Sequence, residues 1–385
     1  MFKNILRNTL RAEETTGAAL PRISRAAVCA AGPSLDLQLP RIARERGAFL
    51  IAADTSLPAL LSAGLRPEAV VSIDCQHISY RHFIPPGGRS GTPDRGGFAL
   101  PPEIPLFLDL ASPPLLASLA GRPVFFSGGH PLAGYISSRW RPFPAVDTSG
   151  GNVTYAAVSL AESLGAAEIE LYGADFSYPL GRTYARGTYI FPYFEIRQNR
   201  LCPLEALFSN FLYRGPLEKK APPQAGEAPA SAGPSISAWY YETETLARYR
   251  EALEAKGGRM GALLLPAGGL GPPLRVHPRP GTGIGLPRPF QGAGIGPPES
   301  PCPARPLRAR DFLADYREKI RALPAPKSGP AADYPAGLNG EERQVLATLL
   351  PLTAALRRKD PLLRGAAIIG ETREYAAAAV DQVLD

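Results

Sequence analysis

The chain has 385 residues, of which 45% are hydrophobic and 20% are charged. This composition is ordinary for a globular protein and excludes wholesale disorder. The sequence contains no run of about 18 apolar residues, so we expect no membrane-spanning helix. The first residues, MFKNILRNTLRAEE, lack the apolar core of a secretion signal, and we therefore expect a cytoplasmic protein.

The net charge of +7 comes from 42 Lys and Arg against 35 Asp and Glu. Such an excess attracts nucleic acids or anionic metabolites. Here it consists mainly of scattered arginines, without the aromatic-interleaved basic stripe of a nucleic-acid binder, so we expect no nucleic-acid partner. The four cysteines have no CxxC or CxxxxH spacing, which predicts no zinc site.

From Arg25 onward, short apolar runs alternate with segments of helical character. The alternation predicts an α/β fold with a Rossmann-like, mostly parallel sheet and helices on both faces. Strands are predicted at Arg25–Ala31, Ala48–Ala53, Ala69–Ile73, Ile104–Leu108, Pro123–Phe126 and Ala167–Tyr172, and a short apolar run without an assigned structure follows at Met260–Leu265. Helices are predicted after Ser34 to about Arg46, and at Ser56–Ala63, Gly151–Leu164, Ser237–Ala255, Asp311–Leu323, Glu341–Arg358 and Thr372–Leu384.

Proline and glycine, 43 and 39 residues, are unevenly spread and predict the domain boundaries. We expect an N-terminal extension (1–24), a Rossmann-like domain (25–270) with a Pro/Ala/Gly-rich insertion near 215–234, a linker (271–308), and a small helical domain (309–385).

The carboxyl ends of parallel strands meet at one edge of the sheet, where α/β proteins bind their ligands. Polar or glycine-rich segments stand at this predicted edge: Gly32-Pro33-Ser34, Asp54-Thr55-Ser56, Asp74-Cys75-Gln76, Ser149-Gly150-Gly151-Asn152 and Gly173-Ala174-Asp175. The GxGxxG and GxxxxGK[ST] patterns are absent, which disfavours nicotinamide and P-loop enzymes.

Each segment admits a functional and a structural interpretation. Gly32 and Ser34 either approach a phosphate or form a plain helix start. Gly150, Gly151 and Asn152 are suited to an anion at the positive end of a helix.

The acidic and basic side chains of this edge leave similar alternatives. Asp54 suits a ribose hydroxyl or caps the next helix, and Asp74 suits Mg²⁺ or is a solvated loop carboxylate. Asp175 ends a strand in a functional or structural role. His77 and His130 are candidate bases.

Five motifs in order, GPSL, AADTS, SIDCQ, SGGNV and LGAAEIELYGADFSYPLGRTYARG, resemble the MptE-like family, named for the archaeal 6-hydroxymethylpterin diphosphokinase. Its bacterial members include the motility accessory factors, which resemble sialyltransferases and glycosylate flagellin. The resemblance covers about residues 25–200.

Residues 150–185 are also similar to bacterial sialyltransferases, which hold the leaving phosphate of a CMP-sugar with two tyrosines six residues apart. Tyr178 and Tyr184 have that separation. Those enzymes carry a catalytic His before a later helix, where this sequence has Trp239-Tyr240-Tyr241-Glu242, so the resemblance assigns no general base.

The resemblance implies a Maf-like glycosyltransferase that moves a nonulosonic, sialic-acid-like sugar from a CMP-linked donor to a protein hydroxyl, such as one of flagellin. Tyr178 and Tyr184 would hold the phosphate, and Asp175 or Asp74 would bind a metal or orient the acceptor. Nucleotide-binding residues would be Gly32, Ser34, Asp54, Gly150, Gly151 and Asn152.

Two alternatives stay open. One is ATP-dependent pyrophosphoryl transfer, with Mg²⁺ bound through Asp54 and Asp74. The other is a non-catalytic nucleotide-binding scaffold.

Overall fold

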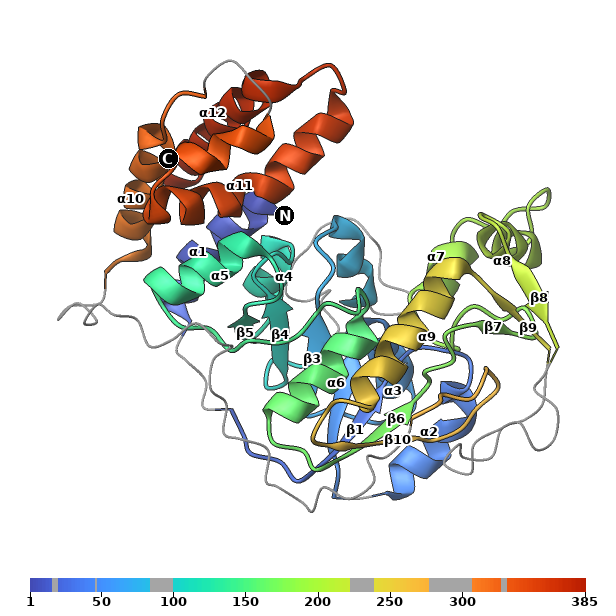
Figure 1. Cartoon of the computed structure of the whole chain (residues 1–385). Helices are drawn as coiled ribbons and strands as arrows, with labels where there is room; N and C mark the ends of the chain where they lie inside the picture. Colours follow the sequence, from blue (N-terminus) through green and yellow to red (C-terminus); the bar gives the residue numbers. More distant parts are fainter. Residues whose placement is uncertain (16–19, 46, 84–99, 222–238, 277–306, 327–330) are drawn as a thin grey trace.

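The computed structural model describes residues 1–15, 20–45, 47–83, 100–221, 239–276, 307–326 and 331–385. At its centre is a seven-stranded sheet in the order β10-β6-β1-β2-β3-β4-β5, with every neighbouring pair parallel (Figure 1). The strands are β1 (Arg25–Cys29), β2 (Phe49–Ala53), β3 (Ala69–Ser72), β4 (Pro105–Asp109), β5 (Arg122–Phe126), β6 (Glu168–Tyr172) and β10 (Leu263–Pro266).

Both faces of the sheet are buried, because its strands consist almost wholly of apolar residues. Alternate residues enter different hydrophobic clusters, as where Ala27 and Cys29 face one cluster and Ala26 and Val28 the other. One face packs against α2 (Leu35–Arg44), α3 (Leu57–Ser62), α4 (Pro114–Leu119) and α5 (Pro131–Arg139). The other packs against α6 (Val153–Ser163) and α9 (Glu244–Gly257). The predicted α/β class is confirmed.

The order of the strands reverses beside β1. The chain adds β2 to β5 on one side of β1, and then returns to add β6 and β10 on the other. Loops on either side of such a reversal leave the sheet in opposite directions, so a crevice is expected between the carboxyl ends of β1 and β6.

A second, antiparallel sheet of β7 (Tyr178–Pro179), β9 (Tyr240–Glu242) and β8 (Glu218–Lys220) lies beside α7 (Ile190–Glu195) and α8 (Leu204–Leu212), at the right of Figure 1. The sequence predicts none of these elements. The helix expected from Ser237 instead begins at Glu244, because Tyr240–Glu242 pair with β7 and β8 as a strand.

The first and last helices form one helical layer at the upper left of Figure 1. Helix α1 (Phe2–Glu14) was expected to be an extension, but Ile5 and Leu6 are fully buried and belong to the same hydrophobic cluster as the C-terminal helices. Those helices are α10 (Ala309–Ala322), α11 (Gly340–Lys359) and α12 (Gly365–Leu384).

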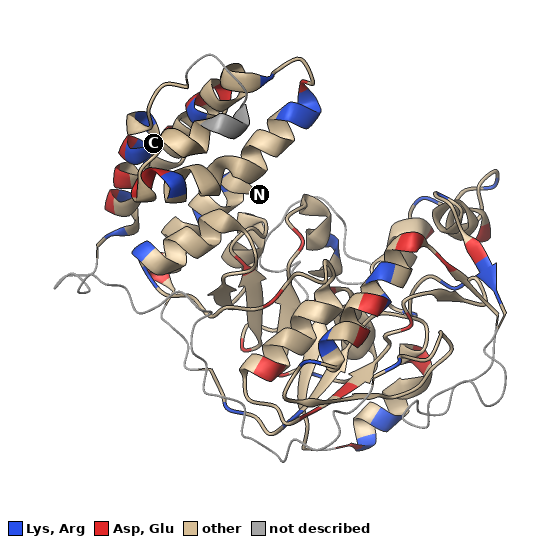
Figure 2. Ribbon diagram, in the orientation of Figure 1, with Lys and Arg blue, Asp and Glu red and all other residues tan. Residues whose placement is uncertain are grey.

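Aromatic side chains join α10 to α5. The ring centroids of Tyr135 and Tyr316 are 5.5 Å apart, and those of Trp140 and Phe312 are 6.1 Å apart. The predicted linker and insertion fall largely on residues outside the described ranges, so the domain boundaries stay predictions. Among the described helices, none is long and apolar enough to cross a membrane. Figure 2 shows basic and acidic residues interspersed over the helices.

Candidate functional site

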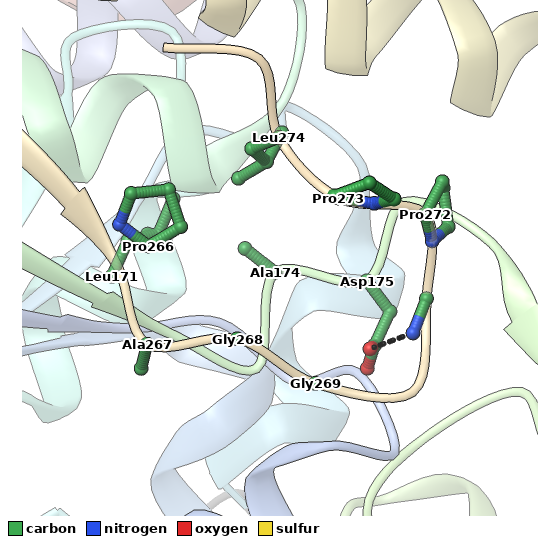
Figure 3. Close-up of a pocket in the computed structure, with 11 residues that line it drawn as sticks. Leu171, Ala174, Asp175, Pro266, Ala267, Gly268, Gly269, Pro272, Pro273 and Leu274 are labelled. Carbon is green, nitrogen blue, oxygen red and sulfur yellow. Dashed lines mark hydrogen bonds between the residues drawn. The ribbon is translucent and has the colours of Figure 1, made fainter. Parts of the chain in front are cut away.

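At the reversal point, the loops after β1, β6 and β10 converge on the carboxylate of Asp175, which is only 4% exposed. The backbone N–H of Ser34 donates to Asp175 Oδ2 at 2.8 Å, and the Ser34 hydroxyl donates to Oδ1. The N–H of Gly271 donates to Oδ1 at 3.1 Å (Figure 3). Burial raises the pKa of Asp175, and these hydrogen bonds offset part of the increase. The carboxylate therefore holds three loops together.

This convergence also explains the glycine after β1. A Cβ at Gly32 would lie 2.3 Å from an oxygen of Asp175 and 2.5 Å from the carbonyl oxygen of Gly173. The pocket beside Asp175 in Figure 3 has a volume of about 30 Å³, which is room for a water molecule or two. Gly32, Ser34 and Asp175 are thus brought together as predicted, in a packed interior too small for a nucleotide.

The glycine-rich motif before α6 forms a capped helix start at the carboxyl edge of the sheet. Asn152 Oδ1 accepts from the N–H of Tyr155 at 2.9 Å, and its Nδ2 donates to the carbonyl of Gly150 at 3.1 Å. Gly151 has φ +70°, a left-handed conformation that favours glycine. A Cβ at Gly150 would strike the Tyr155 ring at 2.2 Å. A nucleotide-binding role for this motif stays a prediction.

Asp54 and Asp74 follow neighbouring strands but differ in their surroundings. Asp54 is buried and accepts hydrogen bonds from the Ser72 hydroxyl at 2.7 Å and from the Thr55 N–H at 2.7 Å. Asp74 is half-buried and accepts from the N–H of Gln76 at 2.8 Å. Within the described ranges, no three His, Cys, Asp or Glu side chains gather as a metal site.

Tyr178 and Tyr184 come together with Tyr189 and Arg214; we call these four residues the tyrosine cluster. The rings of Tyr184 and Tyr189 have centroids 6.3 Å apart. Burial raises the pKa of Tyr178, and the charge of Arg214 and a hydrogen bond from it counteract this increase. Burial also raises the pKa of Tyr184, and the charge of nearby Asp54 adds to it. The cluster therefore lies near the end of β2.

The backbone around Tyr178 is strained. Phe176 and Leu180 have φ values of 43° and 52°, which side chains other than glycine rarely adopt. The buried hydroxyls of Ser177 and Thr183 have no hydrogen-bond partner in the described part of the chain. Strain and unpaired groups of this kind persist only where packing enforces them, and they cluster at functional sites.

The two histidines predicted as candidate bases lie in different surroundings. His130 begins α5, where its Nδ1 accepts from the N–H of Leu132 at 3.2 Å, and burial lowers its pKa to about 4. His77 is exposed at the start of the 3₁₀ segment η2 (His77–Phe83). A third histidine, His82, was not predicted. It is buried edge-on against Tyr189, with ring centroids 4.6 Å apart.

Sequence reasoning also missed Asp109, Tyr189 and Arg214. Asp109 directly follows the predicted strand Ile104–Leu108, so the strand-end rule applied elsewhere would have found it. Tyr189 and Arg214 lie in segments without any such pattern, and only the tertiary fold brings them to the site.

Comparison with known proteins gives a family-model match to part of the chain. Residues 2–181 match the family model described as 6-hydroxymethylpterin diphosphokinase MptE-like. An uncharacterized protein of Treponema pallidum (strain Nichols) is 45% identical over 93 residues, which is 24% of this chain and 33% of the relative. A second from the same organism is 37% identical over 88 residues, 22% of this chain and 41% of the relative. The chain thus matches less than half the length of either.

The solved structure of the MAf glycosyltransferase from Magnetospirillum magneticum AMB-1 has a TM-score of 0.49 and 13% identity, covering 100% of this chain and 58% of that chain. The family match confirms the resemblance carried by the motifs at the strand ends. Residues 2–181, from α1 through β7, therefore carry an MptE-like domain.

Proposed function

We propose that this protein is a glycosyltransferase that moves a nonulosonic sugar from a CMP-linked donor to a protein hydroxyl, such as one of flagellin. The observation that carries the proposal is the tyrosine cluster. Tyr178 and Tyr184 meet Arg214 beside the carboxyl end of β2, in an arrangement that suits a phosphate. Guanidinium and phenol groups are hydrogen-bond donors, and phosphate oxygens accept from both.

The chemistry of transfer gives these donors a reason to be partly buried. When the bond between the sugar carbon and the phosphate oxygen breaks, its electron pair stays with the phosphate, whose negative charge increases. Donors aimed at that oxygen strengthen as the charge develops, and more so away from water. Tyrosine hydroxyls keep their protons at neutral pH, and burial raises the pKa values of Tyr178 and Tyr184 further.

The rest of the carboxyl edge would bind the nucleotide. Ser72 and Thr55 fix Asp54 close to Tyr184, where its carboxylate would accept a hydrogen bond from a ribose hydroxyl. The start of α6, with Gly150, Gly151 and Asn152, offers the positive end of a helix. Gly32, Ser34 and Asp175 would support this edge from beneath, since their polar groups bond to one another.

The alternative is ATP-dependent pyrophosphoryl transfer, which the description of the matching family favours. That reaction requires Mg²⁺ beside the phosphates. Both oxygens of Asp54 accept hydrogen bonds from Ser72 and Thr55, and within the described residues neither Asp54 nor Asp74 belongs to a group of three or more His, Cys, Asp or Glu side chains. Asp54 and Asp74 are the carboxylates that would hold Mg²⁺ against the phosphates of ATP, since Mg²⁺ bound with a nucleotide uses one or two carboxylates.

The test is a thermal-shift screen with CMP, CDP, UDP and ATP, each with and without Mg²⁺, because a ligand that binds the folded state raises its melting temperature. We expect stabilisation by CMP without Mg²⁺. The Arg214→Gln variant should weaken CMP binding roughly 10- to 100-fold, as expected for loss of a charge-assisted hydrogen bond. Arg200→Gln removes one exposed positive charge outside the tyrosine cluster and is the matched control.

The other outcomes of the screen distinguish glycosyl transfer from pyrophosphoryl transfer and from a non-catalytic scaffold. Stabilisation by ATP alone, and only with Mg²⁺, would favour pyrophosphoryl transfer. Binding of CMP without turnover of any nucleotide sugar would favour the scaffold. No response to any of the four nucleotides would contradict a nucleotide site at this edge.

A further inference from the structure

Two arginine guanidinium groups lie against the ring of Tyr193, in the last turn of α7. The central carbon of Arg197 lies 3.5 Å from the ring centroid of Tyr193, and that of Arg81, from η2, lies 4.2 Å from it. Arg197 is also tied to the turn, because its Nη1 donates to the carbonyl of Tyr193 at 3.2 Å. Two segments far apart in the sequence thus bring like charges onto one aromatic ring.

Nothing acidic in the described residues is paired with these two arginines, since neither forms a salt bridge there. An aromatic face attracts each cation, but it does not remove the repulsion between them. The hydrogen bond and charge of Arg81, together with the charge of Arg197, lower the pKa of the Tyr193 hydroxyl. The local field is therefore positive, and an anion would relieve the repulsion.

The pair lies next to the tyrosine cluster. Burial raises the pKa of the Tyr189 hydroxyl, and the charges of Arg214 and Arg81 counteract part of this increase. The ring of Tyr189 is the neighbour of Tyr184. The centroid of the Tyr193 ring lies 5.6 Å from that of Phe194, which lies 6.0 Å from that of Phe211, and the Arg214 guanidinium stands 3.9 Å from the Phe211 centroid. The two cationic groups therefore border one aromatic cluster.

We propose that Arg81 and Arg197 bind a second anionic group of the ligand whose phosphate lies at Arg214 and Tyr184. This inference rests on the proposed function and adds to it a second subsite for an anionic group. The second group is either a carboxylate on the transferred sugar or a further phosphate of the nucleotide. A planar guanidinium binds both kinds of oxyanion with two parallel hydrogen bonds.

Isothermal titration of CMP, CMP-N-acetylneuraminic acid and CDP separates the two sources. If the group is a sugar carboxylate, the wild-type protein should bind CMP-N-acetylneuraminic acid at least about tenfold more tightly than CMP. If it is a second phosphate, CDP should show that preference instead. Arg81→Gln and Arg197→Gln should each remove most of the preference and change CMP affinity by less than about twofold.

Two further variants make the result specific. Arg81→Lys keeps the charge but loses the paired hydrogen bonds, so it should recover only part of the preference. Arg200→Gln should behave as wild type. Since Arg197 is exposed, its replacement should leave the fold intact even if that of Arg81 does not.

Equal wild-type affinity for all three ligands, or a preference that survives both glutamine variants, would overturn the second subsite alone. In that case CMP would still bind and Arg214→Gln would still weaken it. Absence of binding by any of the three ligands would overturn the subsite and the proposed function together.

Discussion

Tyr184 combines three properties in one side chain: it is partly buried, its pKa is raised, and it lies beside the charge of Asp54. With its pKa raised, the hydroxyl stays protonated at neutral pH and can donate a hydrogen bond. The three properties also mean that its hydrogen bond to a phosphate would be made in a site with little competing water.

Replacing Tyr184 by Phe should lower kcat far more than it raises KM. The phenol donates most strongly when the phosphate gains charge in the transition state, so its loss should cost on the order of 10²-fold in kcat. Steady-state kinetics of nucleotide-sugar hydrolysis or transfer measures this, with Tyr375→Phe on α12 as the control. An unchanged kcat would mean that Tyr184 only packs against its aromatic neighbours.

Asp109 is the second residue whose environment sets a measurable property. It is 6% exposed, its Oδ1 accepts from the N–H of Ala111 at 2.7 Å, and burial raises its pKa from 3.8 to about 6. A Cβ at Gly128 would lie 2.0 Å from Asp109 Oδ2, so this oxygen is pressed against the loop after β5.

Because the folded state prefers protonated Asp109, its contribution to stability is complete below about pH 4 and is lost as the pH rises through about 6. Asp109→Asn should therefore stabilise the protein by up to about 3 kcal/mol at pH 8 and by about half as much at pH 5. Urea unfolding at both pH values tests this, with Asp74→Asn as the control. A gain in stability that is independent of pH would show that the pKa of Asp109 is not raised in the folded state.

Among the elements, α6 depends on the motif that precedes it. The Asn152 side chain closes the first turn, and Gly150 and Gly151 let the chain enter it tightly. Capping and ligand binding are separable at this position, because an aspartate caps a helix as well as an asparagine but adds a negative charge.

Asn152→Ala should destabilise the protein by about 1 kcal/mol, and Asn152→Asp should restore that stability. If the nucleotide phosphates also lie at this helix start, Asn152→Asp should still bind CMP more weakly than wild type. Chemical denaturation and CMP titration of both variants provide the two readouts. Full CMP affinity in Asn152→Asp would limit the motif to capping.

How far an element was predictable depended on its length and on how local its contacts are. The strands of the large sheet could be recognised because runs such as Ala69–Val71 are wholly apolar, and α6 because it is long and begins with a glycine turn. By contrast, β7 has two residues and α7 has six, too few for a periodic pattern. Strand β9 was mistaken for helix because its partners lie in distant parts of the chain.

The same limit applies to the site. Tyr178 and Tyr184 belong to one motif and could be paired from its resemblance to the sialyltransferases, whereas Arg214 joins them only through α8 and the small sheet. Asp175 was recognisable as a strand-end carboxylate, but its hydrogen bonds with Ser34 and Gly271 come from three separate loops.

For the molecule as a whole, the C-terminal helices are joined to the rest through α1 and α5. Phe312, Leu313 and Tyr316 of α10 belong to the same hydrophobic cluster as Leu6 of α1. Arg317 adds an ion pair to Asp381 at 2.7 Å that ties α10 to α12.

Limited proteolysis should cut first within 271–308, because that segment is rich in proline and glycine, and the two fragments should then stay together. Size-exclusion chromatography after cleavage tests both parts, and 4 M urea should separate the fragments. Fragments that part in buffer alone would mean that the cluster between α10, α1 and α5 contributes little. Resistance throughout 271–308 would refute the linker assignment.

The pairing of α1 with α12 has a consequence for how the chain is made. Lys3 Nζ donates to Gln382 Oε1 at 2.8 Å, across 379 positions of sequence, and α1 packs against both α10 and α12. At a synthesis rate of about 5–20 residues per second, the apolar side of α1 waits some tens of seconds for its partners to leave the ribosome. Helix α1 is thus translated well before α10 and α12, and its apolar side stays without these partners during that interval.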